Sequence, residues 1–219
     1  VTGRWEDFIR NDLVPYIDRH FRTRSSGRQR ALAGHSMGGY GAIWLGARHP
    51  ELFAVVYALS PACLDFSEHF LRRQKEDILA AMQVRERELF PRLPWRQQVV
   101  IAVAAAVAPN PAKPPFLVDF PFRQENGQPV LDQAVWQRWL AYDPYSQLPA
   151  WRENLTRLRL AFDMGTSDPL LPQVRHFAAA LKELGIPFWY QEYEGGHSER
   201  LPERLQEQAL PWLAENLVN

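Results

Sequence analysis

Hydrophobic spacing in the first quarter of the chain predicts helix and strand in alternation. Residues 5–21 place apolar side chains at helical spacing, and Pro15 is expected to bend this helix or mark its restart. A short strand is predicted at 29–34 and a helix at 37–48, closed by a His-Pro pair. Residues 53–59 are an unbroken apolar run, which is typical of a buried parallel strand. The helical positions in 5–21 are Trp5, Phe8, Ile9, Leu13, Ile17 and Phe21.

The same alternation returns near the end of the chain. A strand is predicted at 159–163, followed by an amphipathic helix at 172–184 that Gly185 stops. A second strand follows at 187–193 and a final helix at 199–217. Strands that alternate with helices indicate a mostly parallel sheet covered on both faces, which defines an α/β fold class.

Residues 62–150 break this rhythm. A charged helical stretch at 65–89 leads to an apolar run at 99–108, a proline-rich stretch at 109–122 and a helix that carries Trp136 and Trp139. We interpret 62–150 as a cap-like insertion over the carboxyl ends of the strands, within one domain spanning 1–219. The alternative is an ordinary helical core, but the position of the segment between two strands of the sheet favours a cap.

Composition and charge narrow the classes of partner. The chain has 219 residues, 46% of them hydrophobic, so it can bury a sizeable core. Lys plus Arg and Asp plus Glu both number 25, which argues against a nucleic-acid or anionic-membrane partner. The basic cluster that precedes the first strand is interpreted as a solvated loop. It contains Arg22, Arg24, Arg28 and Arg30.

The cysteine count and the lengths of the apolar runs argue against disulfide-bonded, CxxC metal-binding and membrane-spanning proteins. Cys63 is the single cysteine, so an intramolecular disulfide and a CxxC metal site are both excluded, and a structural thiol is expected. The longest apolar run, 99–108, falls far short of the ~20 residues of a membrane helix. No signal peptide is visible, and a cytoplasmic location is slightly favoured.

The stretch "GHSMG" at 34–38 fits the G-x-S-x-G pattern of a nucleophile elbow. In such a turn Ser36 occupies a strained backbone conformation, and side chains at 34 and 38 are expected to collide, which explains both glycines. The turn aims the N–H of Met37 and the start of the next helix at a developing oxyanion. A phosphate-binding loop is disfavoured because neither GK[ST] nor G-x-G-x-x-G is present.

An activated serine needs a base, and the base needs an orienting carboxylate. His197 follows the last strand and two glycines, so its ring is free to swing over the sheet. Asp168 follows the preceding strand, whereas Asp163 at the strand end is expected to hold the loop and Asp143 to sit in a turn. The other five histidines are interpreted as structural or exposed; they are His20, His35, His49, His69 and His176.

Four blocks of the sequence together resemble one group of α/β-hydrolases. The blocks are "GHSMGGYGA", "YDPYSQL", "DMGTSDP" and "YEGGHS". They are similar to the esterase group that contains S-formylglutathione hydrolases (esterase D), feruloyl esterase modules and the antigen 85 mycolyltransferases. The resemblance covers nearly the whole chain and implies a serine carboxylesterase with Ser36, Asp168 and His197 as its triad. It also likens the proline-rich stretch to the segment that lines the acyl pocket in bacterial members.

The sequence departs from that group before the elbow. Only one helix and one strand precede Ser36, so the early strands and the loop that supplies a second oxyanion N–H are missing. The elbow strand is therefore expected at a sheet edge with unpaired backbone groups. Three alternatives would each account for this edge: the chain is a fragment of a longer or cleaved polypeptide, a partner chain or second copy covers the edge, or the protein is a degenerate and poorly active hydrolase. We favour the first, with the missing portion present as a separate or disordered N-terminal piece.

The predicted reaction is acyl transfer from a small-molecule ester through an acyl-enzyme on Ser36. Met37 supplies one oxyanion N–H, and no metal or cofactor is needed. Alternatives are an acyltransferase with the same triad and a non-catalytic module that binds a ligand or partner. An apolar acyl or aryl group is expected against aromatic residues of 62–150, with the substrate-binding candidates being Trp95, Phe116, Phe120 and Trp136; Phe122 and Trp139 belong to the same aromatic set.

Overall fold

The computed structural model describes residues 3–66 and 68–217, which divide into two compact units. One unit combines Arg4–Asp65 with 147–217 and holds the parallel sheet. The other unit combines Gly3 with Phe66–Ser146. The predicted arrangement of 62–150 as a cap over the strand ends stays a prediction.

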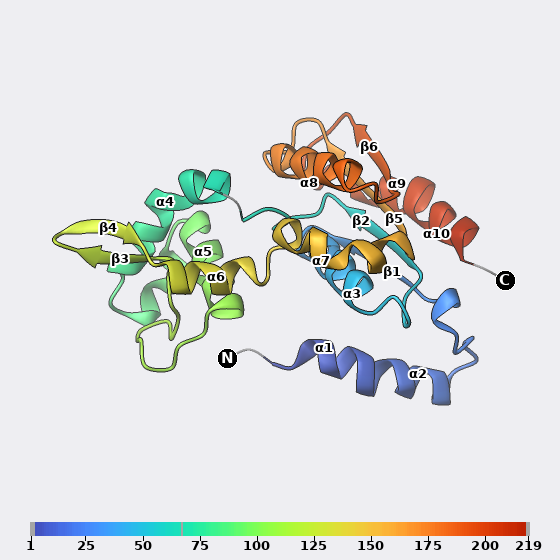
Figure 1. Ribbon diagram of the computed structural model, residues 1–219, viewed down its shortest axis with the longest axis horizontal. Helices are drawn as coiled ribbons and strands as arrows, with labels where there is room; N and C mark the ends of the chain where they lie inside the picture. The colour runs from blue at the N-terminus through green and yellow to red at the C-terminus, as the bar shows by residue number, and fades with distance from the viewer. Residues whose placement is uncertain (1–2, 67, 218–219) are drawn as a thin grey trace. The chain divides into compact units, whose positions relative to one another are not determined.

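A four-stranded parallel sheet forms the centre of the first unit (Figure 1). Its strands are β1 (Ala31–His35), β2 (Val55–Leu59), β5 (Arg159–Gly165) and β6 (Trp189–Tyr193), in the order β1-β2-β5-β6. All neighbouring pairs are parallel, so the predicted α/β class is confirmed. β1 begins two residues later than predicted because Gly27–Gln29 forms a short 3₁₀ turn.

Helices cover both faces of this sheet. On the face that carries Val56 and Phe162 lie α3 (Met37–Arg48), α7 (Pro144–Thr156) and α8 (Leu171–Glu183). On the face that carries Tyr57 and Ala161 lies the carboxyl-terminal helix, which runs as α9 (Leu201–Arg204), a π-helical segment (Leu205–Ala209) and α10 (Leu210–Asn216). The strongly apolar β2 is buried at all five positions because it has strands on both sides and helices on both faces.

β1 lies at the edge of the sheet, as predicted from the few elements before the elbow. Within the described residues it pairs with β2 alone, and none of its residues is fully buried. The helical region before it comprises α1 (Trp5–Asp7), a π-helical segment (Phe8–Leu13) and α2 (Val14–His20). Pro15 stands in the first turn of α2, where it restarts the α-helix.

The amino-terminal helical region is held mainly by polar contacts. Glu6 accepts hydrogen bonds from Arg48 Nε at 2.9 Å and from His49 Nε2 at 2.7 Å. Asp18 pairs with Arg30 in the turn before β1. The apolar side chains of this region are largely exposed, with 69% of Trp5 open to solvent, so their helical spacing does not mark a buried face.

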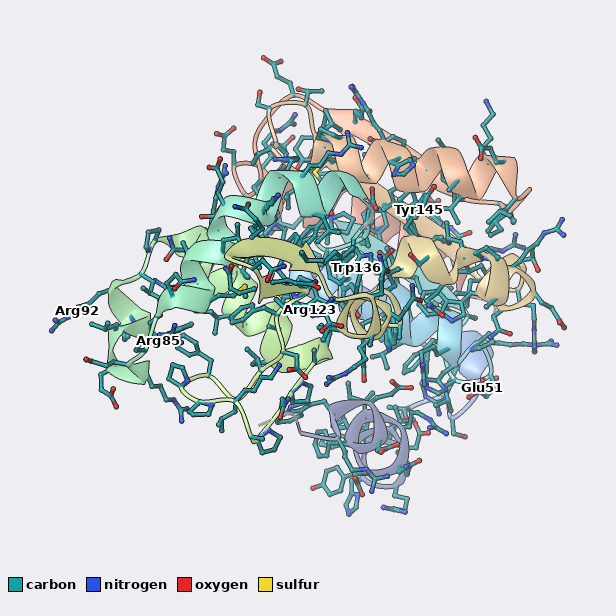
Figure 2. The ribbon with its side chains drawn as sticks, turned by 60° about the vertical axis from the view of Figure 1, so that its left-hand side comes forward. Glu51, Arg85, Arg92, Arg123, Trp136 and Tyr145 are labelled. Atoms are coloured by element: carbon teal, nitrogen blue, oxygen red, sulfur yellow. The ribbon has the colours of Figure 1, made fainter. Side chains whose placement is uncertain are left out.

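The second unit is built mainly from helices (Figure 2). It contains α4 (Glu68–Gln83), a 3₁₀ segment (Arg87–Arg92), α5 (Trp95–Val107) and α6 (Gln133–Leu140). Between α5 and α6 a hairpin joins β3 (Phe122–Glu125) to β4 (Gln128–Leu131). This hairpin was not predicted, although its Asn126-Gly127 turn, with both residues at positive φ, is a recognised hairpin signal.

Aromatic residues form the core of the second unit. Trp139 is completely buried and its ring lies 6.1 Å from that of Phe66 and 6.2 Å from that of Trp136. Asp143 is buried and caps the start of α7 by accepting hydrogen bonds from the N–H and hydroxyl of Ser146. Asp143 is therefore the cap of a helix that the sequence analysis did not predict.

Among the residues described, no helix combines the length and apolar character that crossing a bilayer requires.

Candidate active site

Ser36 stands between the end of β1 and the start of α3 in a strained backbone conformation. Its φ is 57° and its ψ is −118°, a region that L-residues other than glycine rarely adopt. Three backbone hydrogen bonds hold it there: its N–H donates to Leu59 O at 2.9 Å, and its carbonyl accepts from the N–H groups of Tyr40 and Ala62, each at 3.1 Å. The predicted strand-to-helix turn is thus present, with the serine as the residue that precedes α3.

The glycines of the turn differ in whether a side chain would fit in their place. A Cβ on Gly34 would lie 2.1 Å from the carbonyl oxygen of Gly38, so only glycine fits at 34. A Cβ on Gly39 would lie 3.0 Å from Pro61, which explains close packing there. A Cβ on Gly38 would meet nothing within 4 Å, so the expectation that a side chain at 38 collides is wrong. The close approach is between the Cα of Gly34 and the backbone of Gly38, and the Cβ direction at 38 points into open space.

The structure brings the three predicted catalytic side chains into one hydrogen-bonded chain. His197 Nδ1–H donates to Asp168 Oδ2 at 2.6 Å, and the Ser36 hydroxyl donates to His197 Nε2 at 2.8 Å. The carboxylate of Asp168 is fully buried, whereas 32% of the His197 side chain is exposed. The other carboxylate oxygen of Asp168 accepts from the N–H of Leu170 at 2.8 Å, which fixes the rotation of the carboxylate.

Backbone contacts lock the two loops that carry Asp168 and His197 against each other. The N–H of Thr166 donates to Tyr193 O at 2.8 Å, and the N–H of Ser167 donates to Gly195 O at 2.9 Å. A Cβ on Gly165 would lie 2.3 Å from Gly195 O, so the two loops touch backbone to backbone. The imidazole is consequently held by its loop as well as by its carboxylate.

His35 contributes a contact that the sequence analysis did not predict. Its Nε2–H donates to the carbonyl oxygen of His197 at 2.8 Å, and the two imidazole rings lie 4.9 Å apart. The sequence alone led us to interpret His35 only as structural or exposed. Its position beside the predicted nucleophile is the only sequence signal for the contact, because the bond spans 162 residues.

His20, His49 and His176 lie outside this chain of hydrogen bonds. His20 bonds to the carbonyl of Tyr16 and His49 bonds to Glu6. His176, on α8, bonds to the buried carboxylate of Asp65 at 2.7 Å. His69 lies in α4 of the other unit.

Asp163 anchors the sheet beneath the Asp168 loop. It is fully buried and accepts hydrogen bonds from the Tyr57 hydroxyl at 3.0 Å and Arg204 Nε at 2.9 Å. Burial raises the pKa of Asp163, and the Arg204 guanidinium opposes that rise. Burial beside the Asp163 carboxylate also raises the pKa of Tyr57. Asp163 is thus consistent with a structural role rather than with orienting the imidazole.

The substrate-binding candidates lie in the second unit, and their approach to Ser36 stays a prediction. Phe116 and Phe120 line a cavity of about 370 Å³ within that unit. Trp136 is packed in its core, whereas 74% of Trp95 is exposed. Met37, the predicted oxyanion donor, begins α3 with its backbone N–H in the first helical turn, where N–H groups have no partner within the helix.

A parallel sheet with helices on both faces and a strained serine turn between a strand and the next helix define the α/β-hydrolase class. The chain matches the Esterase family profile, described as "Putative esterase", over residues 2–210. The chain therefore belongs to this esterase family, and the resemblance inferred from its four sequence blocks is confirmed.

Several solved structures share this fold. A ferulic acid esterase is 22% identical in sequence with a TM-score of 0.58, and the match covers 97% of this chain and 60% of the esterase. The S-formylglutathione hydrolase of Staphylococcus aureus is 19% identical with a TM-score of 0.57, and the match covers 95% of this chain and 63% of the hydrolase. MPT51 of Mycobacterium tuberculosis is 16% identical with a TM-score of 0.57, and the match covers 98% of this chain and 69% of MPT51. The chain spans less than two thirds of the first two of these proteins.

Proposed function

We propose that this chain carries the catalytic residues of a serine esterase that cleaves carboxylic esters through an acyl-enzyme on Ser36. The observation that carries the proposal is the continuous hydrogen-bonded chain from Asp168 through His197 to Ser36, with distances of 2.6 and 2.8 Å. Membership of the esterase family supports it. The similar fold of a ferulic acid esterase and of an S-formylglutathione hydrolase also supports it.

The geometry supports a separate step in acyl transfer for each residue. Ser36 Oγ attacks the ester carbonyl while His197 Nε2 accepts its proton, because that nitrogen is the unprotonated one when Nδ1–H faces Asp168. Asp168 holds this tautomer and stabilises the imidazolium that forms. The imidazolium then protonates the departing alcohol, and water releases the acyl group by the reverse sequence.

The oxyanion of the tetrahedral intermediate forms beside the start of α3. The backbone N–H of Met37 directs a hydrogen bond to it, and the partial positive charge of the helix start adds to that stabilisation. One oxyanion donor is typically worth about 10²–10³ in turnover, so a second donor outside this set would raise the rate by that order. The strain at Ser36 keeps its hydroxyl clear of the sheet throughout.

Labelling with a fluorophosphonate probe tests the proposal directly. Wild-type protein should be labelled and should hydrolyse p-nitrophenyl acetate, and Ser36→Ala should lose both. Ser25→Ala is the matched control, since Ser25 is an exposed serine in the loop before β1 and should leave both readouts unchanged. Labelling that persists in Ser36→Ala would contradict the assignment of the nucleophile.

A further inference from the structure

A cavity of the sheet-containing unit opens at the opposite end of the strands from Ser36. It encloses about 540 Å³, within the range of roughly 300–1,000 Å³ that small-molecule sites occupy. Its walls include Ala54 just before β2, Arg159 at the start of β5 and Trp189 at the start of β6. Ser36 follows the carboxyl end of β1, and a seven-residue strand such as β5 spans about 20 Å, so the two places are separate.

Strand register explains why two tryptophans meet at this cavity. Tyr57, Ala161 and Trp189 are register neighbours on β2, β5 and β6, so their side chains share one sheet face. Arg159 lies two residues before Ala161 and shares that face. Trp212 reaches the same place from α10, and its ring lies 5.7 Å from Tyr57, compared with 6.0 Å for Trp189. Both indoles are partly buried, packed on the core and lining the cavity.

Three arginines line the cavity together with the tryptophans. Arg28 comes from the turn before β1, Arg157 from the loop after α7, and Arg159 from β5. Within residues 3–66 and 68–217, none of these three guanidinium groups has a carboxylate partner or a side-chain hydrogen bond, and no Asp or Glu lines the cavity. Arg30, from the same predicted basic loop, differs because it pairs with Asp18.

Positive charge is concentrated at this cavity, although the chain as a whole has no net charge. The chain has equal numbers of acidic and basic residues, yet this cavity carries three positive charges and no negative one. Guanidinium groups bind phosphate through paired, charge-assisted hydrogen bonds, and indole faces stack on planar rings. An uncharged ester would form no ion pair with the arginines, and an inorganic anion without a ring would not stack on the indoles.

We propose that this cavity is a binding site for a planar ring that carries a phosphate group, of the size of a nucleoside monophosphate. The phosphate lies among Arg28, Arg157 and Arg159, and the ring lies against Trp189 and Trp212. The site is independent of the proposed esterase chemistry, because it shares no residue with the Ser36 turn or the two loops that complete that site.

Isothermal titration calorimetry with adenosine 5′-monophosphate tests this site, with adenosine and inorganic phosphate as the two half-probes. Wild-type protein should bind the monophosphate saturably and more tightly than either half-probe, and added salt should weaken that binding. The variant R157A/R159A should raise the Kd by about 100-fold, the order expected for the loss of two charge-assisted hydrogen bonds. Both arginines are exposed, so the variant should retain the wild-type unfolding temperature.

The matched control is Arg92→Ala, because Arg92 is an exposed arginine that extends from the edge of the other unit (Figure 2). It should bind the monophosphate as wild type does. Trp212→Leu should weaken the monophosphate and adenosine while leaving inorganic phosphate unchanged. The proposal is overturned by an absence of saturable monophosphate binding to wild type, by equal affinity in R157A/R159A, or by inorganic phosphate binding as tightly as the monophosphate.

Discussion

Replacing His35 tests whether the residue before Ser36, the proposed nucleophile, positions His197, the proposed base. His35→Phe keeps a flat ring of similar size and removes the donor to the carbonyl of His197, a bond of 2.8 Å across 162 residues. One such bond contributes about 0.5–1.5 kcal/mol to stability, so the variant should fold with a slightly lower unfolding temperature. Its effect on ester hydrolysis should be larger, because the bond fixes the backbone that carries the imidazole.

The expected loss of kcat in His35→Phe depends on how far the hydrogen bonds among Ser36, His197 and Asp168 can lengthen. The Ser36–His197 and His197–Asp168 contacts are 2.8 and 2.6 Å, so a small shift of the loop lengthens both. Misplacement of a reacting group by about 1 Å can cost about 10²-fold in rate. We expect His35→Phe to lower kcat for p-nitrophenyl acetate by about 10- to 100-fold with KM nearly unchanged, since the contact does not touch substrate.

Two further variants distinguish a role of His35 in positioning His197 from a general disturbance of the structure. His35→Gln can donate from its amide to the same carbonyl and should recover most of the lost kcat. His20→Phe makes the same substitution at an exposed histidine that also bonds to a backbone carbonyl, and it should leave kcat unchanged. A His35→Phe enzyme with wild-type kcat, or a fall in kcat that His35→Gln fails to reverse, would refute the reasoning.

Three other predictions concern stability. Gly34→Ala should lower the free energy of unfolding, measured with denaturant, by about 1–3 kcal/mol or more, because its Cβ would lie 2.1 Å from a backbone oxygen. Gly38→Ala should change that free energy by less than about 1 kcal/mol, because the space around its Cβ is open. Arg204→Met should cost about 3–5 kcal/mol because it leaves the buried carboxylate of Asp163 unpaired. Asp119→Asn should cost about 1–3 kcal/mol at pH 7, because charged donors surround that buried carboxylate.

Each of these predictions has its own control. The double variant R204M/D163N should be more stable than Arg204→Met alone, and equal stability would contradict a cost from the unpaired charge. For Asp119, burial raises the pKa, but hydrogen bonds from Lys113, Asn110 and Arg138 lower it overall. Its contribution is therefore present above the ordinary pKa of 3.8 and is lost as the pH falls through the lower folded value. A wild-type advantage over Asp119→Asn that persists unchanged at pH 2 would contradict this sign.

Local pattern determined much of the sheet-containing unit. The elbow glycine at 34, the apolar run of β2 and the helix at 37–48 each follow from spacing within a few residues, and all three appear in the structure. Chain order and loop position were enough to select Asp168 and His197, because both follow parallel strands whose carboxyl ends share one edge. These features are local, or they follow from the rule that parallel strands align their ends.

Only the tertiary structure decided the contacts between distant residues. No spacing places His35 on the carbonyl of His197, and no composition gathers Arg28, Arg157 and Arg159 around two indoles. The open space at Gly38 likewise depends on the direction in which α3 leaves the turn. Sequence periodicity reports which face of an element is apolar, whereas the neighbours of a side chain depend on strand order and register, which form only when segments more than a hundred residues apart pack together.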